Sequence, residues 1–232
     1  MKVLGVIPAR GGSKGIPNKN KKELLGKPLM QYTIESALAA TKLDALVFSS
    51  EDEGLIALAE TLSIEVPFKR PEELATDTAG TLEVLQFTVD QLAKQEKHFD
   101  AVCLLQVTNP FRTSKFIDNA IQKFKESNTD SLISVLEVPH EYNPHWVFKT
   151  NAHKNLELAI AEDSIIKRRQ DLPKAYYRDG SIYITKTKVL LEQNSLYGDS
   201  IAYIEADASR HVNIDTMDDW LKAETLAKKL EM

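Results

Sequence analysis

Residues 9 to 20 combine glycine with positive charge in the order ARGGSKGIPNKN. Gly11, Gly12 and Gly15 carry no side chain, so backbone N–H groups near them can approach an anion closely. The segment also supplies cations and a hydroxyl group, on Arg10, Ser13, Lys14 and Lys19. Together these groups suit a polyphosphate, and we call residues 9–20 the phosphate loop. Its spacing matches neither a Walker A loop nor the GxGxxG fingerprint, which disfavours P-loop hydrolysis and dinucleotide redox chemistry.

A second candidate segment, VNIDTMDDW, starts at residue 212 and places Asp215 just before a predicted helix. Mg²⁺ prefers oxygen ligands and is typically held by one or two carboxylates together with substrate phosphates. We therefore predict that Asp215 binds Mg²⁺ beside the phosphate loop. Asp218 and Asp219 stand one turn further on. Acids favour a helix N-terminus through its dipole, and we assign these two that structural role.

Two further segments carry polar groups that either bind a ligand or serve the structure. The segment LLQVTNPFR ends a buried strand with Gln106, Thr108 and Asn109, which either hydrogen-bond a hydroxylated ligand or cap the strand and the following turn. The basic run KRRQDLPK, residues 167–174, is either a solvated loop or a contact for an anion. The histidines lack a metal-binding spacing and no G-x-S-x-G is present, so zinc and serine hydrolysis have no support.

The composition is that of one large globular domain. The chain has 232 residues, of which 43% are hydrophobic, and its 29 Lys and Arg against 34 Asp and Glu give a net charge of −5. This balance argues against broad binding to nucleic acid or to an anionic membrane, because both need clustered positive charge. No apolar stretch approaches a membrane span, and the first residues lack a signal-peptide pattern. Cys103 is predicted as an inert core thiol, and we expect a cytoplasmic protein.

Short apolar runs alternate with helical periodicities over the first 138 residues. Strands are predicted at residues 3–8, 45–49, 65–68, 101–106 and 131–138. Helices are predicted, the last of them with Ser114 as its cap, at residues 29–40, 55–62, 82–93 and 116–124. This alternation predicts an α/β fold with a mostly parallel, doubly wound sheet. The phosphate loop follows the first strand, and such sheets bind ligands at the carboxyl ends of their strands.

The alternation then stops in a stretch of turns, a strand-like run and strong charge, at residues 140–144, 146–150 and 162–174. We interpret this stretch as an insertion in a single domain that spans residues 1–232. Core patterns return in two strands and a C-terminal amphipathic helix, at residues 180–185, 201–205 and 216–230. Thr216 and Asp219 form a predicted capping pair at the start of that helix.

Five segments of this chain, in the same order, resemble those of the acylneuraminate cytidylyltransferases, also called CMP-N-acetylneuraminate synthetases. They are IPARGGSKGIPNKN, FKRPEELATDTAGT, LLQVTNPFR, RQDLPKAYYRDGSIYI and NIDTMDDW. The resemblance implies a Rossmann-like nucleotidyltransferase fold, CTP as co-substrate, Mg²⁺, and a homodimer that uses an arm at about residues 140–180. It also implies transfer of CMP from CTP to the anomeric hydroxyl of a nonulosonic acid, in the first place N-acetylneuraminate, with release of pyrophosphate.

The resemblance further implies roles for individual residues. The triphosphate of CTP would be held by Arg10, Gly11, Ser13, Lys14, Lys19 and Asn20. The cytosine and ribose would face Arg70, Ala79 and Thr81, and the sugar acid would face Gln106, Arg169 and Tyr197. Asp215 would bind Mg²⁺. Arg10, Lys14 and Asp215 would then carry the chemistry, by stabilising charge on the phosphoryl oxygens.

The chain departs from the family pattern near the metal and around the presumed sugar site. Asn213 stands where the family commonly has a second acid, which leaves the number of metal ions open. The other departures are Val107, Asn109, Phe111 and Asp179. They leave the acceptor open among N-acetylneuraminate, legionaminate, pseudaminate and, less favoured by the loop sequence, the eight-carbon Kdo. A non-catalytic nucleotide-binding relative is the remaining alternative.

Overall fold

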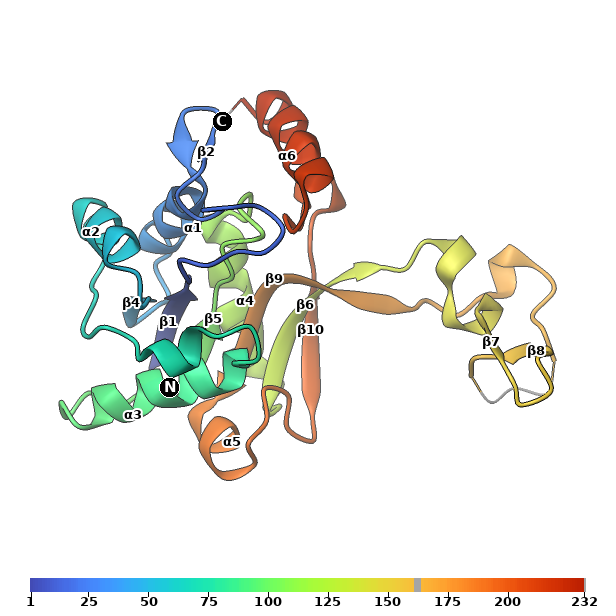
Figure 1. The fold of residues 1–232 in the computed structure, drawn as a ribbon. Coiled ribbons are helices and arrows are strands. Elements are labelled where there is room, and N and C mark those ends of the chain that lie inside the picture. Colours follow the sequence, from blue (N-terminus) through green and yellow to red (C-terminus); the bar gives the residue numbers. More distant parts are fainter. Residues whose placement is uncertain (161–163, 232) are drawn as a thin grey trace.

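The computed structural model describes residues 1–160 and 164–231, and a six-stranded sheet forms its centre (Figure 1). The strands lie in the order β10-β6-β9-β5-β1-β4. Their bounds are β1 (Val3–Pro8), β4 (Ala45–Ser49), β5 (Ala101–Leu104), β6 (Ser131–Glu137), β9 (Tyr176–Lys186) and β10 (Ile201–Glu205). β1 runs parallel to β4 and β5, and β6 runs parallel to β10, whereas β9 is antiparallel to both neighbours. The predicted mostly parallel sheet is confirmed, with β9 as its exception.

Helices cover both faces of the sheet, as predicted for a doubly wound fold. One face carries α1 (Leu29–Leu38), α2 (Glu53–Thr61), α4 (Ser114–Ser127) and α6 (Met217–Lys229), and the other carries α3 (Thr81–Ala93) and α5 (Thr187–Glu192). Side chains alternate between the faces along β1, because Val3 and Ile7 join the first core while Leu4 and Val6 join the second. The central strands are therefore buried on both faces.

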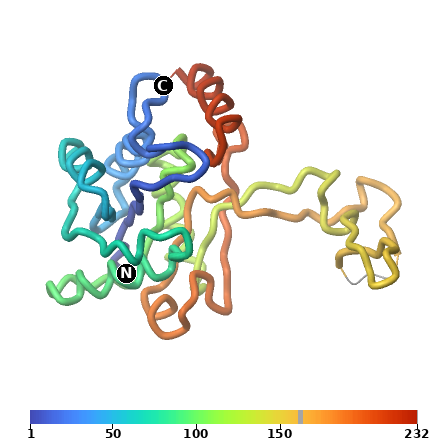
Figure 2. The backbone as a smooth tube through the Cα atoms, viewed as in Figure 1, coloured from blue at the N-terminus to red at the C-terminus, as the bar shows by residue number. Residues whose placement is uncertain are grey.

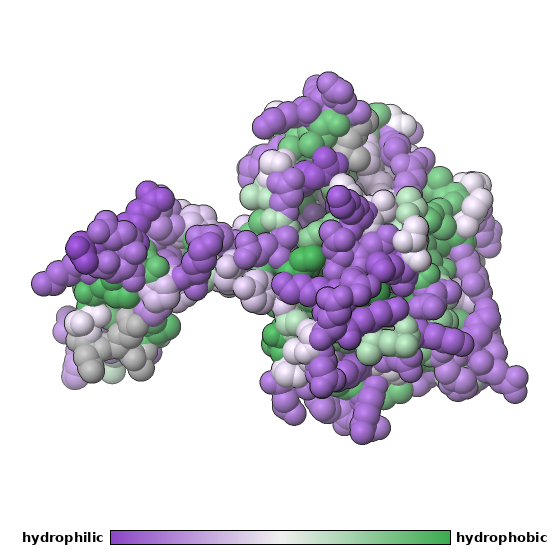
Figure 3. Space-filling view, turned by 180° about the vertical axis from the view of Figure 1, so that it is seen from behind, coloured by the Kyte–Doolittle hydropathy of each residue, from purple (hydrophilic) through white to green (hydrophobic). Residues whose placement is uncertain are grey.

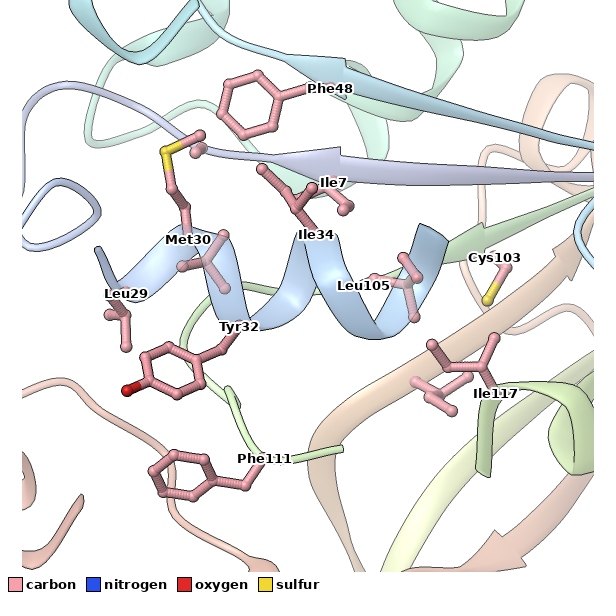
Figure 4. Close-up of a cluster of buried hydrophobic side chains, with 14 of the residues drawn as sticks. Ile7, Leu29, Met30, Tyr32, Ile34, Phe48, Cys103, Leu105, Phe111 and Ile117 are labelled. Atoms are coloured by element: carbon pink, nitrogen blue, oxygen red, sulfur yellow. The ribbon is translucent and has the colours of Figure 1, made fainter. Parts of the chain in front are cut away.

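The first core reaches the chain that follows the phosphate loop. Tyr32 of α1 packs edge to face against Phe111 with ring centroids 5.8 Å apart (Figure 4). The Tyr32 hydroxyl donates a 2.6 Å hydrogen bond to the carbonyl of Leu24. Leu24 belongs to a small hairpin of β2 (Glu23–Leu24) and β3 (Lys27–Pro28) that the sequence did not indicate, since two-residue strands show no period. Phe111, one of the residues that differ from the family pattern, is thus a buried core residue.

Several predicted boundaries are confirmed and two predictions are wrong. The strands at 3–8, 45–49 and 201–205 match β1, β4 and β10, and the Thr216–Asp219 capping box is present. The strand at 65–68 is wrong: Glu65 forms an isolated bridge with Val47, and Pro67 has no N–H to continue a ladder. The cap of α4 is Thr113 rather than Ser114, because the Thr113 side chain accepts the N–H of Phe116 at 3.1 Å.

Residues 138–160 and 164–175 form an arm that projects from the sheet (Figures 1 and 2). β6 and β9 pair as far as Glu137 and Tyr176, and the N–H of Val138 then bonds the carbonyl of Ala175 at 2.8 Å. β9 is antiparallel because the chain leaves β6 into the arm and returns through β9. Beyond lie short turns and a hairpin, namely η2 (His140–Tyr142), η3 (Pro144–Trp146), β7 (Phe148–Thr150), β8 (Leu156–Leu158) and η4 (Arg169–Asp171). Residues 162 and 163 of the predicted charged stretch lie outside the described residues.

The arm exposes several large apolar side chains. Tyr142 is 71% exposed and Leu156 68% exposed, and Val147, Phe148 and Ile165 also reach solvent. Figure 3 shows hydrophobic surface on the arm among its polar groups. By contrast Cys103 of β5 is fully buried, and burial raises the pKa of its thiol to about 12, which confirms an unreactive core position. Within residues 1–160 and 164–231 no helix has the length and apolar character to cross a membrane.

Candidate active site

A cavity of about 450 Å³ opens at the carboxyl ends of β1 and β5, where a parallel sheet binds ligands. Three stretches far apart in sequence form its walls: the phosphate loop, the segment from Arg70 to Val84, and the residues after β5. Asp215 closes it from the loop before α6. The cavity brings together most of the residues predicted for the site, namely Arg10, Ser13, Lys14, Lys19, Asn20, Arg70, Ala79, Thr81, Gln106 and Asp215.

Three side chains, two from other parts of the chain and one from the end of the loop itself, fix the start of the phosphate loop. Arg70 donates to the carbonyl of Ala9 at 3.0 Å, and Asn20 donates to the carbonyl of Arg10 at 2.9 Å. Glu51 accepts the N–H of Gly11 through Oε1 at 2.7 Å and pairs with Arg70 through Oε2 at 2.7 Å. The N–H of Gly11, predicted to face the triphosphate, is therefore already bonded within the protein.

Sequence reasoning missed Glu51. It stands two residues after β4, at the same edge of the sheet as the phosphate loop. An acid at that position could have been predicted to lie beside the loop. The side chain of Arg70 is 3% exposed and that of Glu51 14% exposed, so the ion pair is shielded from water. A buried carboxylate is stable only when it is paired and hydrogen-bonded. Glu51 meets that condition with its two oxygens on two different partners.

Gly15 is required by packing as well as by ligand approach. A Cβ atom built on Gly15 would lie 2.0 Å from the carbonyl oxygen of Asp215, whereas one built on Gly12 meets no atom within 4 Å. A side chain at residue 15 would therefore push the phosphate loop away from Asp215. The missing side chain at Gly15 is what lets the loop and the start of α6 enclose one cavity.

The carboxylate of Asp77 joins two phosphate-loop cations across the cavity. Asp77 Oδ1 lies 3.0 Å from Arg10 Nη2, and Asp77 Oδ2 lies 2.8 Å from Lys14 Nζ. Arg10 also donates through Nη1 to the carbonyl of Thr76 at 2.9 Å. The hydrogen bond from Lys14, aided by the charge of Arg10, holds the pKa of Asp77 below its ordinary value. Sequence reasoning did not identify Asp77 as part of the site.

Asp215 is positioned by two donors. Lys19 Nζ bonds Asp215 Oδ1 at 3.1 Å and the carbonyl of Ile214 at 2.6 Å, and Asn213 Nδ2 donates to Asp215 Oδ2 at 2.7 Å. Asp219 instead caps α6, and its bonds from Thr216 lower its pKa to about 2. The structural role predicted for Asp219 is thereby confirmed.

The donor set around Asp215 can be compared with what Mg²⁺ requires. The described residues contain no group of three or more His, Cys, Asp or Glu arranged to hold a metal. Mg²⁺ needs few protein ligands when substrate phosphates supply the rest. The carboxylate of Asp215, 60% exposed at the cavity, fits that mode as a single anionic ligand.

The residues after β5 divide between the cavity and the interior. Gln106 and Thr108 line the cavity. Asn109 is buried, donating to the carbonyl of Asp179 at 3.0 Å and lying 3.2 Å from His211 Nδ1. The side chain of Asn109 is thus bonded within the protein, and Asn109 also borders a second hollow of about 290 Å³. Arg112, also buried, donates to the carbonyl of Gln106 and so fixes the strand end that presents it.

Arg169 and Tyr197 lie outside the cavity. Arg169 begins η4 in the arm and lines a separate hollow of about 330 Å³ there. Its neighbour Arg168 pairs with Asp171 at 2.7 Å. The Tyr197 hydroxyl accepts a 2.7 Å hydrogen bond from Arg178 Nη1. Within one chain, neither residue reaches the other predicted site residues.

The model of one protein family, described as cytidylyltransferase, matches residues 4–227. The chain belongs to the cytidylyltransferase family. It is 34% identical over 228 residues to a pseudaminic acid cytidylyltransferase of Campylobacter jejuni, covering 98% of this chain and 97% of that protein. It is 33% identical to the CMP-N,N'-diacetyllegionaminic acid synthase of Legionella pneumophila, covering 97% of this chain and 96% of that protein. An N-acylneuraminate cytidylyltransferase of Streptococcus agalactiae is 33% identical, covering 95% of this chain but 52% of its own length.

Solved structures confirm the Rossmann-like nucleotidyltransferase fold predicted from the sequence. A CMP:2-keto-3-deoxy-manno-octonic acid synthetase complexed with CTP superposes with a TM-score of 0.74 at 17% identity, covering 99% of this chain and 100% of that one. A 4-diphosphocytidyl-2C-methyl-D-erythritol synthase from Anaerococcus prevotii gives a TM-score of 0.65 at 11% identity, covering 98% and 96%. Cytidylyltransferases of low sequence identity therefore share this architecture.

Proposed function

We propose that this cytidylyltransferase uses CTP and transfers CMP to the anomeric hydroxyl of a nonulosonic acid, with release of pyrophosphate. The observation that carries the proposal is the cavity at the ends of β1 and β5, in which Arg10 and Lys14 lie on one wall and Asp215 closes another. A triphosphate needs cations and a metal ligand around one volume, and this cavity supplies both kinds of group.

The reaction places negative charge on the phosphoryl oxygens while the sugar hydroxyl attacks the α-phosphorus and pyrophosphate leaves. Arg10 and Lys14 neutralise that charge, and positioned charges of this kind supply much of the catalysis in phosphoryl and nucleotidyl transfer. Mg²⁺ held by Asp215 and the phosphates would act as a Lewis acid on the same oxygens. Lys19 and Asn213 orient the carboxylate of Asp215 toward this task.

The nucleoside end is assigned to the wall between Arg70 and Thr81. Ala79 and Thr81 line the cavity there, and we propose that they face the cytosine and ribose. Arg70 is buried and bonds to Ala9 and Glu51. Its contribution is therefore to hold the phosphate loop as well as to border the nucleoside.

The acceptor is proposed to bind beside Gln106, which lines the cavity next to Thr108. The sequence identities of 34%, 33% and 33% to relatives named for pseudaminic, N,N'-diacetyllegionaminic and N-acylneuraminic acids do not separate these acceptors. N-acetylneuraminate therefore stays the acceptor predicted from the sequence, and the other two stay its alternatives.

The arm is proposed to join two copies of the chain in a homodimer. Its exposed side chains Tyr142 and Leu156 would be covered by the partner. A projecting arm has too little of its own chain around it to bury such apolar groups, so a partner surface would remove them from water. Arg169 lies on the same arm, and in the dimer it would pair with the carboxylate of an acceptor bound at the partner's cavity. Tyr197 lies outside the cavity of its own chain, and we propose that it borders the acyl group of the acceptor in the same dimer.

Pyrophosphate release tests the proposal directly. The purified chain is incubated with Mg²⁺ and CTP against N-acetylneuraminate, pseudaminic acid, N,N'-diacetyllegionaminic acid and Kdo. Turnover is expected with one of the first three and not with Kdo. CTP binding without turnover on any acceptor would favour a non-catalytic relative, and Asn213→Asp would then test whether a second carboxylate restores activity. No CTP binding would contradict the proposal.

A further inference from the structure

Asp77 occupies an unusual position for a carboxylate in a cavity assigned to an anion. It lies between η1 (Glu72–Ala75) and α3, on the wall facing the phosphate loop. Each of its oxygens is paired with a different cation of that loop, Arg10 at 3.0 Å and Lys14 at 2.8 Å. These are the two side chains to which the proposed function gives the triphosphate.

A carboxylate bridging Arg and Lys makes the same charge-assisted hydrogen bonds that phosphate oxygens make. Arg10 also bonds the carbonyl of Thr76 at 2.9 Å, so both of its terminal amino groups are engaged by the segment that carries Asp77. The same N–H groups cannot hold Asp77 and a phosphate in full at one time. A phosphate that takes the N–H groups now facing Asp77 therefore displaces this carboxylate.

We infer that Asp77 is an internal competitor of the nucleotide's triphosphate, released from Arg10 and Lys14 when the phosphates bind and returned to them when pyrophosphate leaves. The inference rests on the proposed function for the identity of the anion. With Asp77 present, the cavity would bind CTP less tightly than its cations alone would allow. Pyrophosphate would also dissociate more readily.

The exchange would also couple the two walls of the cavity. Asp77 precedes Ala79 and Thr81, the residues proposed to face the nucleoside, in one continuous segment. That segment forms its own turn, in which the N–H of Ala79 bonds the Thr76 hydroxyl at 3.1 Å. Release of Asp77 would remove the charged contact between this turn and Arg10 and leave the bonds to the carbonyls of Ala75 and Thr76. Arrival of the phosphates would therefore be sensed where the base binds.

The expected size of the competition follows from exposure. The side chains of Asp77 and Lys14 are 48% and 76% exposed, so water weakens both ion pairs. Each exposed ion pair of this kind contributes little free energy. Removing the two that Asp77 makes should tighten anion binding by about 3- to 10-fold. A larger change would require a buried pair, which Asp77 does not form.

Calorimetric titration of the full chain tests the inference with Asp77→Asn, which keeps the shape but removes the charge, and Asp77→Ala. The probes are inorganic tripolyphosphate, CTP and cytidine, in EDTA at low salt. Glu73→Gln is the matched control, because it removes the same charge from an exposed residue of the same segment. Both Asp77 variants should bind tripolyphosphate and CTP about 3- to 10-fold more tightly, with cytidine binding unchanged and Glu73→Gln like the wild type.

Unchanged or weaker anion binding in both Asp77 variants would overturn the inference, as would an equal gain in Glu73→Gln, which would reflect net charge alone. Absence of tripolyphosphate binding in every variant would overturn it too. The proposed function fails separately, when CTP is not turned over while tripolyphosphate still distinguishes Asp77→Asn from the wild type. Where turnover is present, Asp77→Asn should also strengthen inhibition by pyrophosphate and lower the KM for CTP.

Discussion

In the phosphate loop, the backbone of Ala9 and that of Gly11 bond to side chains from elsewhere in the chain, Arg70 and Glu51, whereas the arm is held largely by contacts within itself. The arm bonds described above run from Val138 to Ala175 and from Arg168 to Asp171. The phosphate loop thus has a fixed shape within one chain. The arm, with its exposed apolar side chains, gains a comparable environment only against another surface.

This difference separates two functions. One chain can bind and polarise the phosphates, whereas contact between the arm and the acceptor needs two chains. The shielded ion pair of Arg70 and Glu51 and close backbone packing preorganise the phosphate loop, and preorganised charge is the form in which electrostatic catalysis is effective. Residues on the arm can act on a ligand bound between the phosphate loop and Asp215 only if another copy brings that cavity to them. Substitutions that disturb the loop should accordingly lower the reaction rate and the free energy of unfolding. Substitutions in the arm should weaken binding of the acceptor.

The largest effect is expected from Gly15→Ala. Its Cβ would lie 2.0 Å from the carbonyl oxygen of Asp215, so the loop must move away from the metal ligand. Misplacement of about 1 Å in a preorganised site can cost about 10²-fold in rate, and we expect at least about that loss in kcat/KM. Gly12→Ala is the matched control, because its Cβ meets no protein atom within 4 Å. An equal loss in both would show that the glycines serve ligand approach rather than packing.

Glu51→Gln should be next in size and should appear in stability as well as in activity. It leaves Arg70 buried beside a neutral partner, and we expect about 2–3 kcal/mol less free energy of unfolding, somewhat below the usual penalty for breaking a buried pair because Glu51 is partly exposed. Urea denaturation measures the change. Glu53→Gln removes an equal charge from the exposed pair with Lys69, and no measurable loss is expected there. Equal stability of the two variants would contradict a structural role for Glu51.

Arg169→Ala tests the arm side of the comparison. We expect the KM for the sugar acid to rise about 10-fold, the usual worth of one charge-assisted contact, with the KM for CTP unchanged. Arg168→Ala is the control, because Arg168 is already paired with Asp171 at 2.7 Å within the arm. Equal rises in both KM values, or the same result in a chain shown by sedimentation to be a monomer, would refute the role across subunits.

Sequence reasoning predicted the elements that carry strong local patterns. The apolar run of β1 and the glycine and lysine pattern behind it predicted a strand followed by an anion site, and Thr216 with Asp219 predicted the start of α6. These signals lie within a few neighbouring residues. The strand expected at 65–68 was wrong because an apolar pair around Pro67 satisfied the pattern without a backbone donor to continue it.

The rest of the site depends on contacts between distant residues, which no local pattern records. Glu51 bonds Gly11 across 40 positions of sequence, and Asp77 reaches Arg10 and Lys14 from another wall of the cavity. An acid in either place is compatible with an ordinary surface loop. The burial of Arg70 and Phe111 was hidden for the same reason, since residue type alone does not show which side chains the fold encloses.

The smallest effect is expected at the capping box of α6, which supports the segment carrying Asp215. The pKa of Asp219, lowered to about 2 chiefly by its bond to Thr216, lies below its ordinary value of 3.8. Its stabilising contribution is therefore complete above about pH 4 and is lost as the pH falls toward 2. Asp219→Asn should cost about 1 kcal/mol of unfolding free energy at pH 7, as for other caps, and the difference from wild type should vanish near pH 2. Asp218→Asn, in the same first turn, is the control, and a pH-independent difference for Asp219→Asn would contradict the carboxylate's role as the cap.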